Sequence, residues 1–194
     1  MKDILRTRML NRRLEMNDEE VGLLSSLINE KLKSLTLWEN IEKAALYWPV
    51  KNEVDVKPLI SWLKEKGKEV YLPQVKGSRL LFGRYRENGL RPGKFGIKEP
   101  NTAGIHPEEI EAFVVPALAY DFDGYRLGFG KGFYDRLIHN KKAHQCFIGV
   151  CYDFQLLESL PKDSWDERVD IVVTERTLVF IPTKFQLEVK PWVS

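Results

Sequence analysis

Short apolar segments bounded by turn residues place the tightest constraint on how this chain folds. Residues 44–48 are apolar and stop at Pro49, and residues 112–115 are apolar and stop at Pro116. Two further apolar segments, residues 146–152 and 171–173, follow later in the chain. Such short, uninterrupted apolar segments are typical of strands that are buried on both faces. Because segments with helical features lie between them, the sequence predicts an α/β domain with a mostly parallel sheet.

The helical segments are identified by apolar spacing and by signals at their ends. Residues 3–14 are basic and compatible with a helix. Asn17 followed by Glu20 has the form of a capping box, which predicts a second helix running to about residue 35. Helices are also predicted over two later segments, residues 55–66 (ended by Gly67) and residues 131–140.

The remaining segments carry weaker signals. Residues 69–73 predict a strand, residues 79–86 a hairpin arm and residues 177–181 a further strand. Residues 87–107 hold five Gly or Pro residues between positions 89 and 100 and show little periodicity. This composition predicts a long loop, and long loops in compact domains are often functional. The tail after Pro182 carries no clear signal.

Length and composition fit one globular domain spanning residues 1–194. The chain has 43% hydrophobic residues, which argues against disorder, and a net charge of +2, which is too small for a nucleic-acid coat. No apolar segment approaches the ~20 residues that span a bilayer, and the first residues lack a secretory apolar core. Two cysteines, Cys146 and Cys151, do not make a disulfide scaffold. We therefore expect a cytoplasmic, monomeric protein with no membrane or nucleic-acid partner.

The segment over residues 116–136 carries most of the chemical information. It contains Gly124, Gly128, Gly130 and Gly132, the last three alternating, with Lys131 between two of them. Alternating glycines between a strand and a helix let backbone amides approach an anion closely, and Lys131 adds a full positive charge. The same glycines are equally needed by a tight turn with positive φ. A phosphate-binding loop is favoured over a turn alone.

Two common phosphate motifs do not fit this segment. A Walker A loop needs glycine where Tyr125 stands and Ser or Thr where Gly132 stands, and a dinucleotide fingerprint needs glycine where Phe133 stands.

Asp135 follows the glycines near the predicted helix start. A carboxylate beside a phosphate site suits magnesium, and an acid near a helix start is also favoured by the helix dipole. Both interpretations of Asp135 stay open on spacing alone.

The stretch RLGFGKGFYD resembles the nucleotide and folate loop of 5-formyltetrahydrofolate cyclo-ligases, also called 5,10-methenyltetrahydrofolate synthetases. The resemblance covers nearly the whole chain in an ordered set of motifs. These are Lys2-x-x-x-Arg6, Tyr47-Trp48-Pro49, Asn52-Glu53-Val54-Asp55, Arg91-Pro92-Gly93, Gly96-Ile97-x-Glu99-Pro100 and Arg168-Val169-Asp170. The ordered set is far more specific than any one of these motifs.

The resemblance implies an ATP- and Mg²⁺-dependent enzyme that converts 5-formyltetrahydrofolate to 5,10-methenyltetrahydrofolate, with ADP and phosphate as products. It also implies a three-layer α/β sandwich with a mostly parallel central sheet and flanking helices. The implied partners are two small molecules, ATP and the formyl-folate.

The resemblance further assigns roles to individual residues. The implied ATP-binding residues are Lys2, Arg6, Gly128, Phe129, Gly130, Lys131, Gly132, Phe133 and Tyr134. The implied folate-binding residues are Trp48, Glu53, Phe129, Gly130, Lys131, Gly132 and Phe133. Lys131 and Tyr134 are the implied catalytic residues, and Asp135 and Asp170 are the implied Mg²⁺ ligands.

Several of these residues have plainer interpretations when they are taken alone. Lys2 and Arg6 suit a solvated basic helix face, and Glu53 suits a loop residue or a helix cap. Trp48 suits the core. Asp170 alone is an acid at the start of a strand, so its assignment to a metal depends on the resemblance. The segment from Arg91 to Pro100 suits either a cover for the site or a connecting loop.

The chain departs from many relatives at Phe133, where they carry tyrosine. If this aromatic residue only packs, the change is harmless, whereas a lost hydroxyl hydrogen bond would lower affinity.

The sequence is also compatible with two other kinds of protein: a non-catalytic binder of nucleotide or folate, and a nucleic-acid-associated protein that uses its basic N-terminal helix. The joint presence of Glu53, Lys131, Asp135 and Asp170 favours an enzyme.

Overall fold

A computed structural model describes residues 1–182 of the chain. The tail after Pro182, and with it the last part of the predicted 1–194 domain, lies outside the described residues. The α-helices are α1 (Lys2–Leu14), α2 (Asp18–Lys33), α3 (Lys57–Glu65) and α4 (Phe133–His139), and the 3₁₀ helices are η1 (Thr36–Asn40), η2 (Lys94–Gly96), η3 (Pro107–Glu109) and η4 (Asp153–Gln155). Among residues 1–182, no helix is both long enough and apolar enough to cross a bilayer.

An eight-stranded mixed sheet forms the centre of the fold, in the order β13-β12-β10-β7-β1-β2-β3-β6. The strands are β1 (Lys43–Ala45), β2 (Glu69–Lys76), β3 (Arg79–Arg84), β6 (Gly104–Ile105), β7 (Ala112–Pro116), β10 (Cys146–Val150), β12 (Ile171–Val173) and β13 (Leu178–Phe180). Neighbouring strands from β12 through β10, β7 and β1 to β2 are parallel, and the strands at both edges pair antiparallel. The predicted mostly parallel sheet is confirmed.

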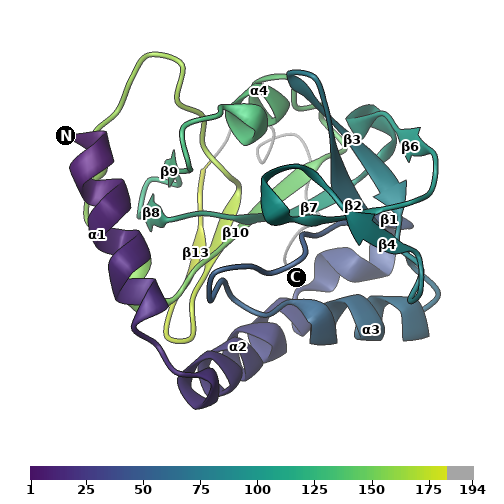
Figure 1. The fold of residues 1–194 in the computed structure, drawn as a ribbon, viewed down its shortest axis with the longest axis horizontal. Coiled ribbons are helices and arrows are strands. Elements are labelled where there is room, and N and C mark those ends of the chain that lie inside the picture. The colour runs from purple at the N-terminus through teal and green to yellow at the C-terminus, as the bar shows by residue number, and fades with distance from the viewer. Residues whose placement is uncertain (183–194) are drawn as a thin grey trace.

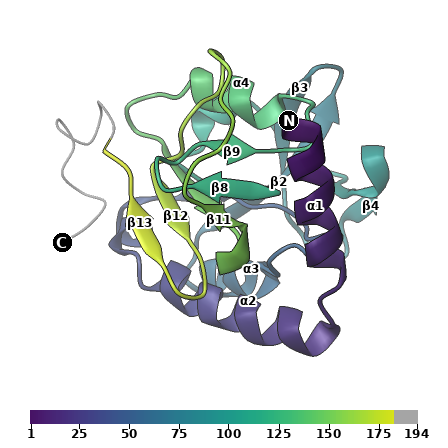
Figure 2. The ribbon, with the colours of Figure 1, turned by 90° about the vertical axis from the view of Figure 1, so that its left-hand side faces the viewer.

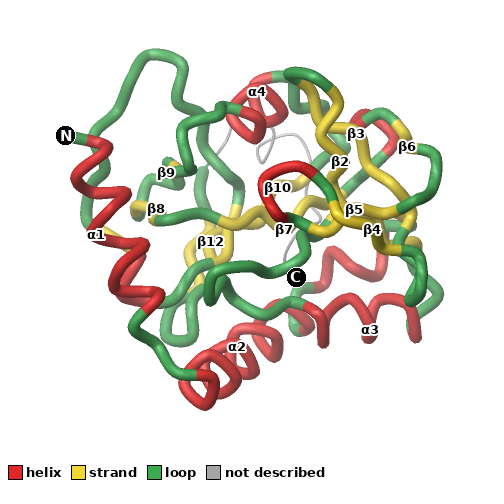
Figure 3. The backbone as a smooth tube through the Cα atoms, viewed as in Figure 1, coloured by secondary structure: helices red, strands yellow, loops and turns green. Residues whose placement is uncertain are grey.

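Side-chain alternation along these strands divides the core into two layers. Ala44, Val114 and Ile148 pack with α2 and α3 on one face of the sheet. Phe113 and Phe147 lie on the opposite face, where their rings stack at 4.5 Å. Figures 1 and 3 show α2 and α3 below the sheet and α4 above it. The arrangement is a three-layer α/β sandwich, as predicted.

Helix α1 does not pack on the main sheet. It packs on a small three-stranded sheet built from β8 (Ala119–Asp121), β9 (Arg126–Leu127) and β11 (Leu156–Leu157). Met9 of α1 belongs to a buried apolar cluster with Leu118 and Leu127. Figure 2 shows α1 standing beside β8 and β9. This packing holds the N-terminus of the chain next to the segment that follows β9.

Most predicted elements are present, with shifted ends. The Asn17 side chain accepts a hydrogen bond from Glu20 N–H at 2.8 Å, which confirms the predicted cap of α2. The strand predicted over residues 44–48 is shorter, since β1 covers only Lys43–Ala45, and the strand predicted over residues 69–73 is longer, since β2 covers Glu69–Lys76.

The prediction of a single long loop over residues 87–107 was wrong. This segment forms a hairpin from β4 (Leu90–Pro92) and β5 (Lys98–Pro100), with η2 between the two strands, and then β6 and η3. The strands are too short, and too poor in apolar residues, to produce a detectable alternation. The small sheet of β8, β9 and β11 is likewise not predicted, for the same reason.

The buried carboxylate of Asp121 ties the small sheet together. One of its oxygens accepts the N–H groups of Asp123 at 3.1 Å and Tyr125 at 2.9 Å, and the other accepts the N–H of Leu160 at 3.0 Å. Hydrogen bonds to a buried charge are among the strongest in proteins, and losing them leaves several amides without partners.

We therefore expect Asp121→Ala to lower the free energy of unfolding by about 3–5 kcal/mol, measured by urea denaturation. Asp123→Ala is the matched control. The Asp123 side chain is 64% exposed and within residues 1–182 pairs only with Lys162, so its loss should cost no more than about 1 kcal/mol. Equal losses in the two variants would contradict this role for Asp121.

Candidate active site

A cavity of about 1210 Å³ opens beside the glycine segment. Its wall is formed by α1, the turn after β1, strand β2, the β4–β5 hairpin, the β9–α4 loop and residues 163–167. The predicted site residues that line it are Lys2, Arg6, Trp48, Glu53, Gly128, Phe129, Gly130, Lys131, Gly132, Phe133, Tyr134 and Asp135. The fold thus brings to one space residues that lie more than 100 positions apart in sequence.

The glycine segment connects β9 to α4, and two of its glycines have backbone conformations that favour glycine. Gly130 has φ 92° and Gly132, which precedes the first residue of α4, has φ 70°. A Cβ at Gly132 would also lie 2.8 Å from the Arg136 guanidinium. The tight-turn interpretation of these glycines is therefore correct, and the turn exposes its backbone to the cavity.

Lys131 projects from this turn as an exposed cation. Its ammonium lies 5.4 Å from the centroid of the Phe95 ring, on η2 of the hairpin. Phe95 also lies 6.5 Å from Phe133, ring centroid to ring centroid. Within residues 1–182 no carboxylate forms an ion pair with Lys131, so its charge is available to a bound anion.

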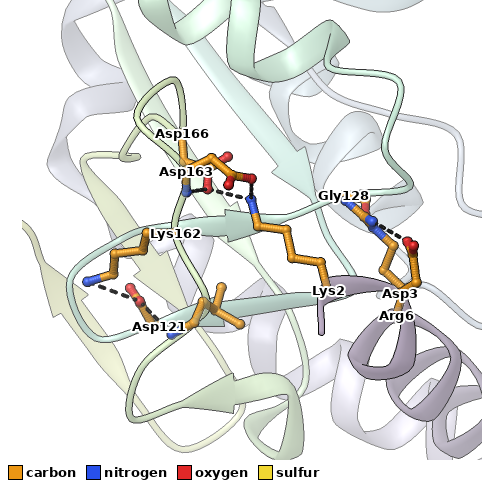
Figure 4. A network of polar contacts seen from close by, with 9 residues as sticks. Lys2, Asp3, Arg6, Asp121, Gly128, Lys162, Asp163 and Asp166 are labelled. Carbon is orange, nitrogen blue, oxygen red and sulfur yellow. Dashed lines mark hydrogen bonds and ion pairs between the residues drawn. The ribbon is translucent and has the colours of Figure 1, made fainter.

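Two basic residues of α1, Lys2 and Arg6, line the same cavity, and Figure 4 shows their polar contacts. The Lys2 ammonium lies 2.6 Å from a carboxylate oxygen of Asp163 and 2.6 Å from one of Asp166. Arg6 donates from Nε to the Gly128 carbonyl at 2.8 Å and pairs with Asp3 at 2.6 Å. Arg6 therefore fastens α1 to the glycine turn, and Lys2 holds the 163–167 loop.

Glu53 and Trp48 line the cavity from the turn after β1. Glu53 is 8% exposed, and one of its oxygens accepts the Val50 N–H at 3.0 Å. Burial raises the pKa of the Glu53 carboxyl, and the positive charge of Arg13 opposes that rise. Trp48 is half-buried and stacks on Tyr85 with ring centroids 5.9 Å apart.

Tyr134 and Asp135 occupy the first turn of α4. Burial raises the pKa of the Tyr134 phenol well above its ordinary value, so this hydroxyl is a hydrogen-bond donor at neutral pH and not a base. Burial also raises the pKa of Asp135, and the nearby Arg126 guanidinium opposes the rise. The Oδ1 atom of Asp135 is buried and accepts no hydrogen bond within residues 1–182. A carboxylate oxygen without a partner, in the wall of a cavity, fits a hard divalent cation.

Asp170 is the one predicted site residue that the fold does not bring to the cavity. It is buried, and its carboxylate pairs with Lys141 and accepts the Phe147 N–H at 2.8 Å. Among residues 1–182 no cluster of three or more His, Cys, Asp or Glu side chains is arranged to hold a metal. The geometry therefore does not support the prediction that Asp170 shares a metal with Asp135, because Asp170 is engaged in a different contact.

The cavity is also lined by polar and aromatic residues that have no predicted role, among them Arg126, Glu99 and Trp165. Arg126 lies 4.9 Å from the Tyr134 ring centroid and donates to the Pro116 carbonyl at 2.8 Å. Glu99 is buried and accepts the Val75 N–H at 3.0 Å, and Trp165 is 68% exposed. Arg126 stands inside the motif that carries the resemblance, so its position was a usable signal. Glu99 likewise stands in the quoted motif Gly96-Ile97-x-Glu99-Pro100, whereas Trp165 follows no pattern that marks it.

Comparison with known proteins identifies the family. The model of the 5-formyltetrahydrofolate cyclo-ligase family matches residues 1–175. A 5-formyltetrahydrofolate cyclo-ligase from Mycoplasma genitalium is 33% identical over 176 residues, which are 89% of this chain and 96% of that protein.

Solved structures agree with this match. The NMR structure of a 5,10-methenyltetrahydrofolate synthetase from Aquifex aeolicus superposes with a TM-score of 0.84 and 41% identity, covering 94% of this chain and 93% of that one. A 5,10-methenyltetrahydrofolate synthetase from Mycoplasma pneumoniae gives a TM-score of 0.76 and 31% identity, covering 90% and 98%. The chain therefore belongs to the 5-formyltetrahydrofolate cyclo-ligase family and is an enzyme of that activity.

Proposed function

We propose that ATP and 5-formyltetrahydrofolate bind together in the cavity described above, with the phosphates beside the glycine turn and the pterin beside Glu53. The enzyme is an ATP-dependent cyclo-ligase that converts 5-formyltetrahydrofolate to 5,10-methenyltetrahydrofolate. The observation that supports the proposed placement is that basic and acidic groups from distant segments line one cavity. Because one chain supplies all of these groups, a monomer remains our prediction; the cytoplasmic location predicted from the sequence also stays a prediction.

The reaction has to convert a poor leaving group into a good one. Transfer of the ATP γ-phosphoryl group to the formyl oxygen turns that oxygen into part of a phosphate ester and releases ADP. The neighbouring folate amine then attacks the formyl carbon, the carbon–oxygen bond breaks, inorganic phosphate leaves and the amine loses its proton. The protein's task is to align the phosphate with the formyl oxygen, to stabilise negative charge and to exclude water.

Lys131 is the proposed electrostatic catalyst at the phosphate end. It is exposed on the glycine turn, with no carboxylate in ion-pair contact within residues 1–182. Lys2 and Arg6 are proposed to contact the ATP phosphates from α1, with Lys2 exchanging Asp163 and Asp166 for phosphate oxygens. The backbone of residues 128–134 supplies N–H groups along the same wall.

Glu53 is the proposed anchor of the folate. Its second oxygen accepts no hydrogen bond within residues 1–182, and a pterin offers adjacent N–H donors that match one carboxylate. Trp48, Phe129 and Phe133 provide aromatic surface for the substrate. Tyr134, held neutral by burial, is proposed to donate a hydrogen bond to the reacting groups.

Asp135 is the proposed protein contact of Mg²⁺. Its Oδ1 has no hydrogen-bond partner in the described part of the chain, and magnesium commonly combines one or two carboxylates with waters and phosphate oxygens. The ion, when bound, would neutralise charge on the transferring phosphate. Asp170 is the weaker candidate, because its carboxylate already pairs with Lys141.

The proposed reaction is tested by following absorbance at the methenyl-folate band with purified protein, 5-formyltetrahydrofolate, Mg²⁺ and ATP. We expect a rise that needs both ATP and protein and that is matched by an equal release of ADP. A folded protein that binds both substrates and gives no rise would contradict the proposal and leave a non-catalytic binder.

Lys131→Ala should lower kcat by about 10²–10³-fold, the usual cost of removing one group that stabilises transition-state charge. Lys142→Ala is the matched control, because Lys142 is exposed and lies outside the cavity. Circular dichroism establishes that both variants are folded. Turnover by a folded Lys131→Ala protein at the rate of the control would exclude the electrostatic role.

Asp135→Asn should raise the Mg²⁺ concentration for half-maximal activity by about tenfold or more, because the amide is a weaker ligand for a hard cation. Asp170→Asn should leave that concentration unchanged and lower stability by on the order of 3 kcal/mol, since it weakens a buried ion pair. Magnesium titrations at saturating ATP and urea denaturation give the two readouts. A shifted magnesium requirement in Asp170→Asn alone would reverse the assignment.

A further inference from the structure

Arg13, in the last turn of α1, is almost completely buried although it carries a charge. It is 1% exposed and is not itself in the wall of the cavity. Its Nε donates to the Lys51 carbonyl at 2.9 Å and its Nη1 to the Ala117 carbonyl at 3.1 Å. Both Lys51 and Ala117 line the cavity, so Arg13 lies directly behind the wall that carries Glu53.

The turn that precedes Glu53 adopts a conformation that needs outside support. Lys51 has φ 51° and Asn52 has φ 58°, both in the left-handed region that side chains with a Cβ rarely adopt. The Arg13 guanidinium fixes the Lys51 carbonyl, and Asn52 returns the contact by donating from Nδ2 to the Arg13 carbonyl at 3.1 Å. The Tyr152 hydroxyl holds the Asn52 carbonyl at 2.9 Å. These contacts fix the direction in which Glu53 leaves the turn.

The charge of Arg13 also acts on the Glu53 carboxylate. Burial raises the pKa of Glu53, and Arg13 is the foremost of the cations that lower it, ahead of Arg126 on β9 and Lys51 on the turn. The other titratable groups facing Glu53 are the phenols of Tyr47 and Tyr134, which burial keeps neutral. Arg13 and Glu53 are not in ion-pair contact, so the Glu53 oxygen that faces away from Val50 is left for a ligand.

We propose that Arg13 is a positioning residue for Glu53: it fixes the turn that presents the carboxylate to the cavity and places a buried positive charge behind that carboxylate. This inference rests on the proposed role of Glu53 in binding the folate. An ionised carboxylate accepts two N–H donors of a heterocycle, whereas a protonated one offers a donor where the substrate needs an acceptor. Arg13 therefore acts on substrate affinity without touching the substrate.

The test compares Arg13→Met with Arg13→Lys, and with Arg12→Met as the matched control. Arg12 is the exposed neighbour of Arg13 on α1, and its guanidinium lies 4.4 Å from the centroid of the Phe154 ring. We expect Arg13→Met to raise KM for 5-formyltetrahydrofolate by about tenfold, with a much smaller change in kcat and in KM for ATP. Arg12→Met should leave all three unchanged.

The pH dependence of kcat/KM for the folate separates positioning from a general loss of stability. Removing the Arg13 charge raises the pKa of Glu53, so the fall in kcat/KM on the acid side should begin at higher pH in Arg13→Met. Arg13→Lys keeps a positive charge, so the acid limb of its kcat/KM profile should stay near that of the wild type. Its KM for the folate should rise, because the hydrogen bonds to the Lys51 and Ala117 carbonyls are lost. If Arg13→Met does not fold, an unchanged folate KM in folded Arg13→Lys overturns the proposal.

Glu53→Gln and the double variant distinguish the two proposals. If Glu53 binds the folate, Glu53→Gln alone raises the folate KM, and adding Arg13→Met adds little further. An unchanged KM in Glu53→Gln overturns the role of Glu53 and the inference with it. A different outcome is that Glu53→Gln raises the folate KM, while the effect of Arg13→Met is fully additive to it and independent of pH. That outcome would keep the role of Glu53, overturn the inference about Arg13 and make Arg13 a purely structural residue.

Discussion

The parallel pairing of β2, β1, β7 and β10 is the constraint on which the active site depends. Parallel strands end at the same edge of a sheet, and the chain must leave each of them there through a new segment. The turn after β1 carries Trp48 and Glu53, the end of β2 carries Val75, and the segment after β7 carries Ala117. One cavity at that edge is therefore a consequence of strand direction.

Helix α1 completes this cavity through contacts that differ in kind at its two ends. Near its N-terminus, Lys2 and Arg6 meet the 163–167 loop and the glycine turn through partly exposed ion pairs and one hydrogen bond to a carbonyl. At its last turn, the guanidinium of Arg13 is buried against two carbonyls behind the wall. The contacts of Lys2 and Arg6 can exchange partners when an anion enters. The Arg13 contacts hold the backbone behind the wall in place, and they do not exchange because a buried charge without partners is costly.

The two ends of the cavity need opposite electrostatics, and the fold separates them. Lys131 stands on an exposed turn, where water solvates its charge. Glu53 is buried, which raises the pKa of its carboxyl, and the charges of Arg13 and Arg126 oppose that rise. Asp135 lies in a third environment, half-buried and with one oxygen lacking a protein partner in the described chain. These differences follow from burial, which no residue type by itself specifies.

The sequence by itself determined the α/β class, the main helices and the central strands, because continuous apolar segments and capping residues act over a few positions. Through the ordered motifs it also predicted twelve site residues, from Lys2 to Asp135, that the fold brings to the cavity. Only the tertiary structure decided that Asp170 turns to Lys141 and Phe147, that the 87–107 segment folds as a hairpin, and that Arg13 supports Glu53. Those outcomes depend on which residues far apart in the sequence come into contact and on how deeply each is buried. Neither can be read from a short stretch of sequence, because both are set by the packing of the whole chain.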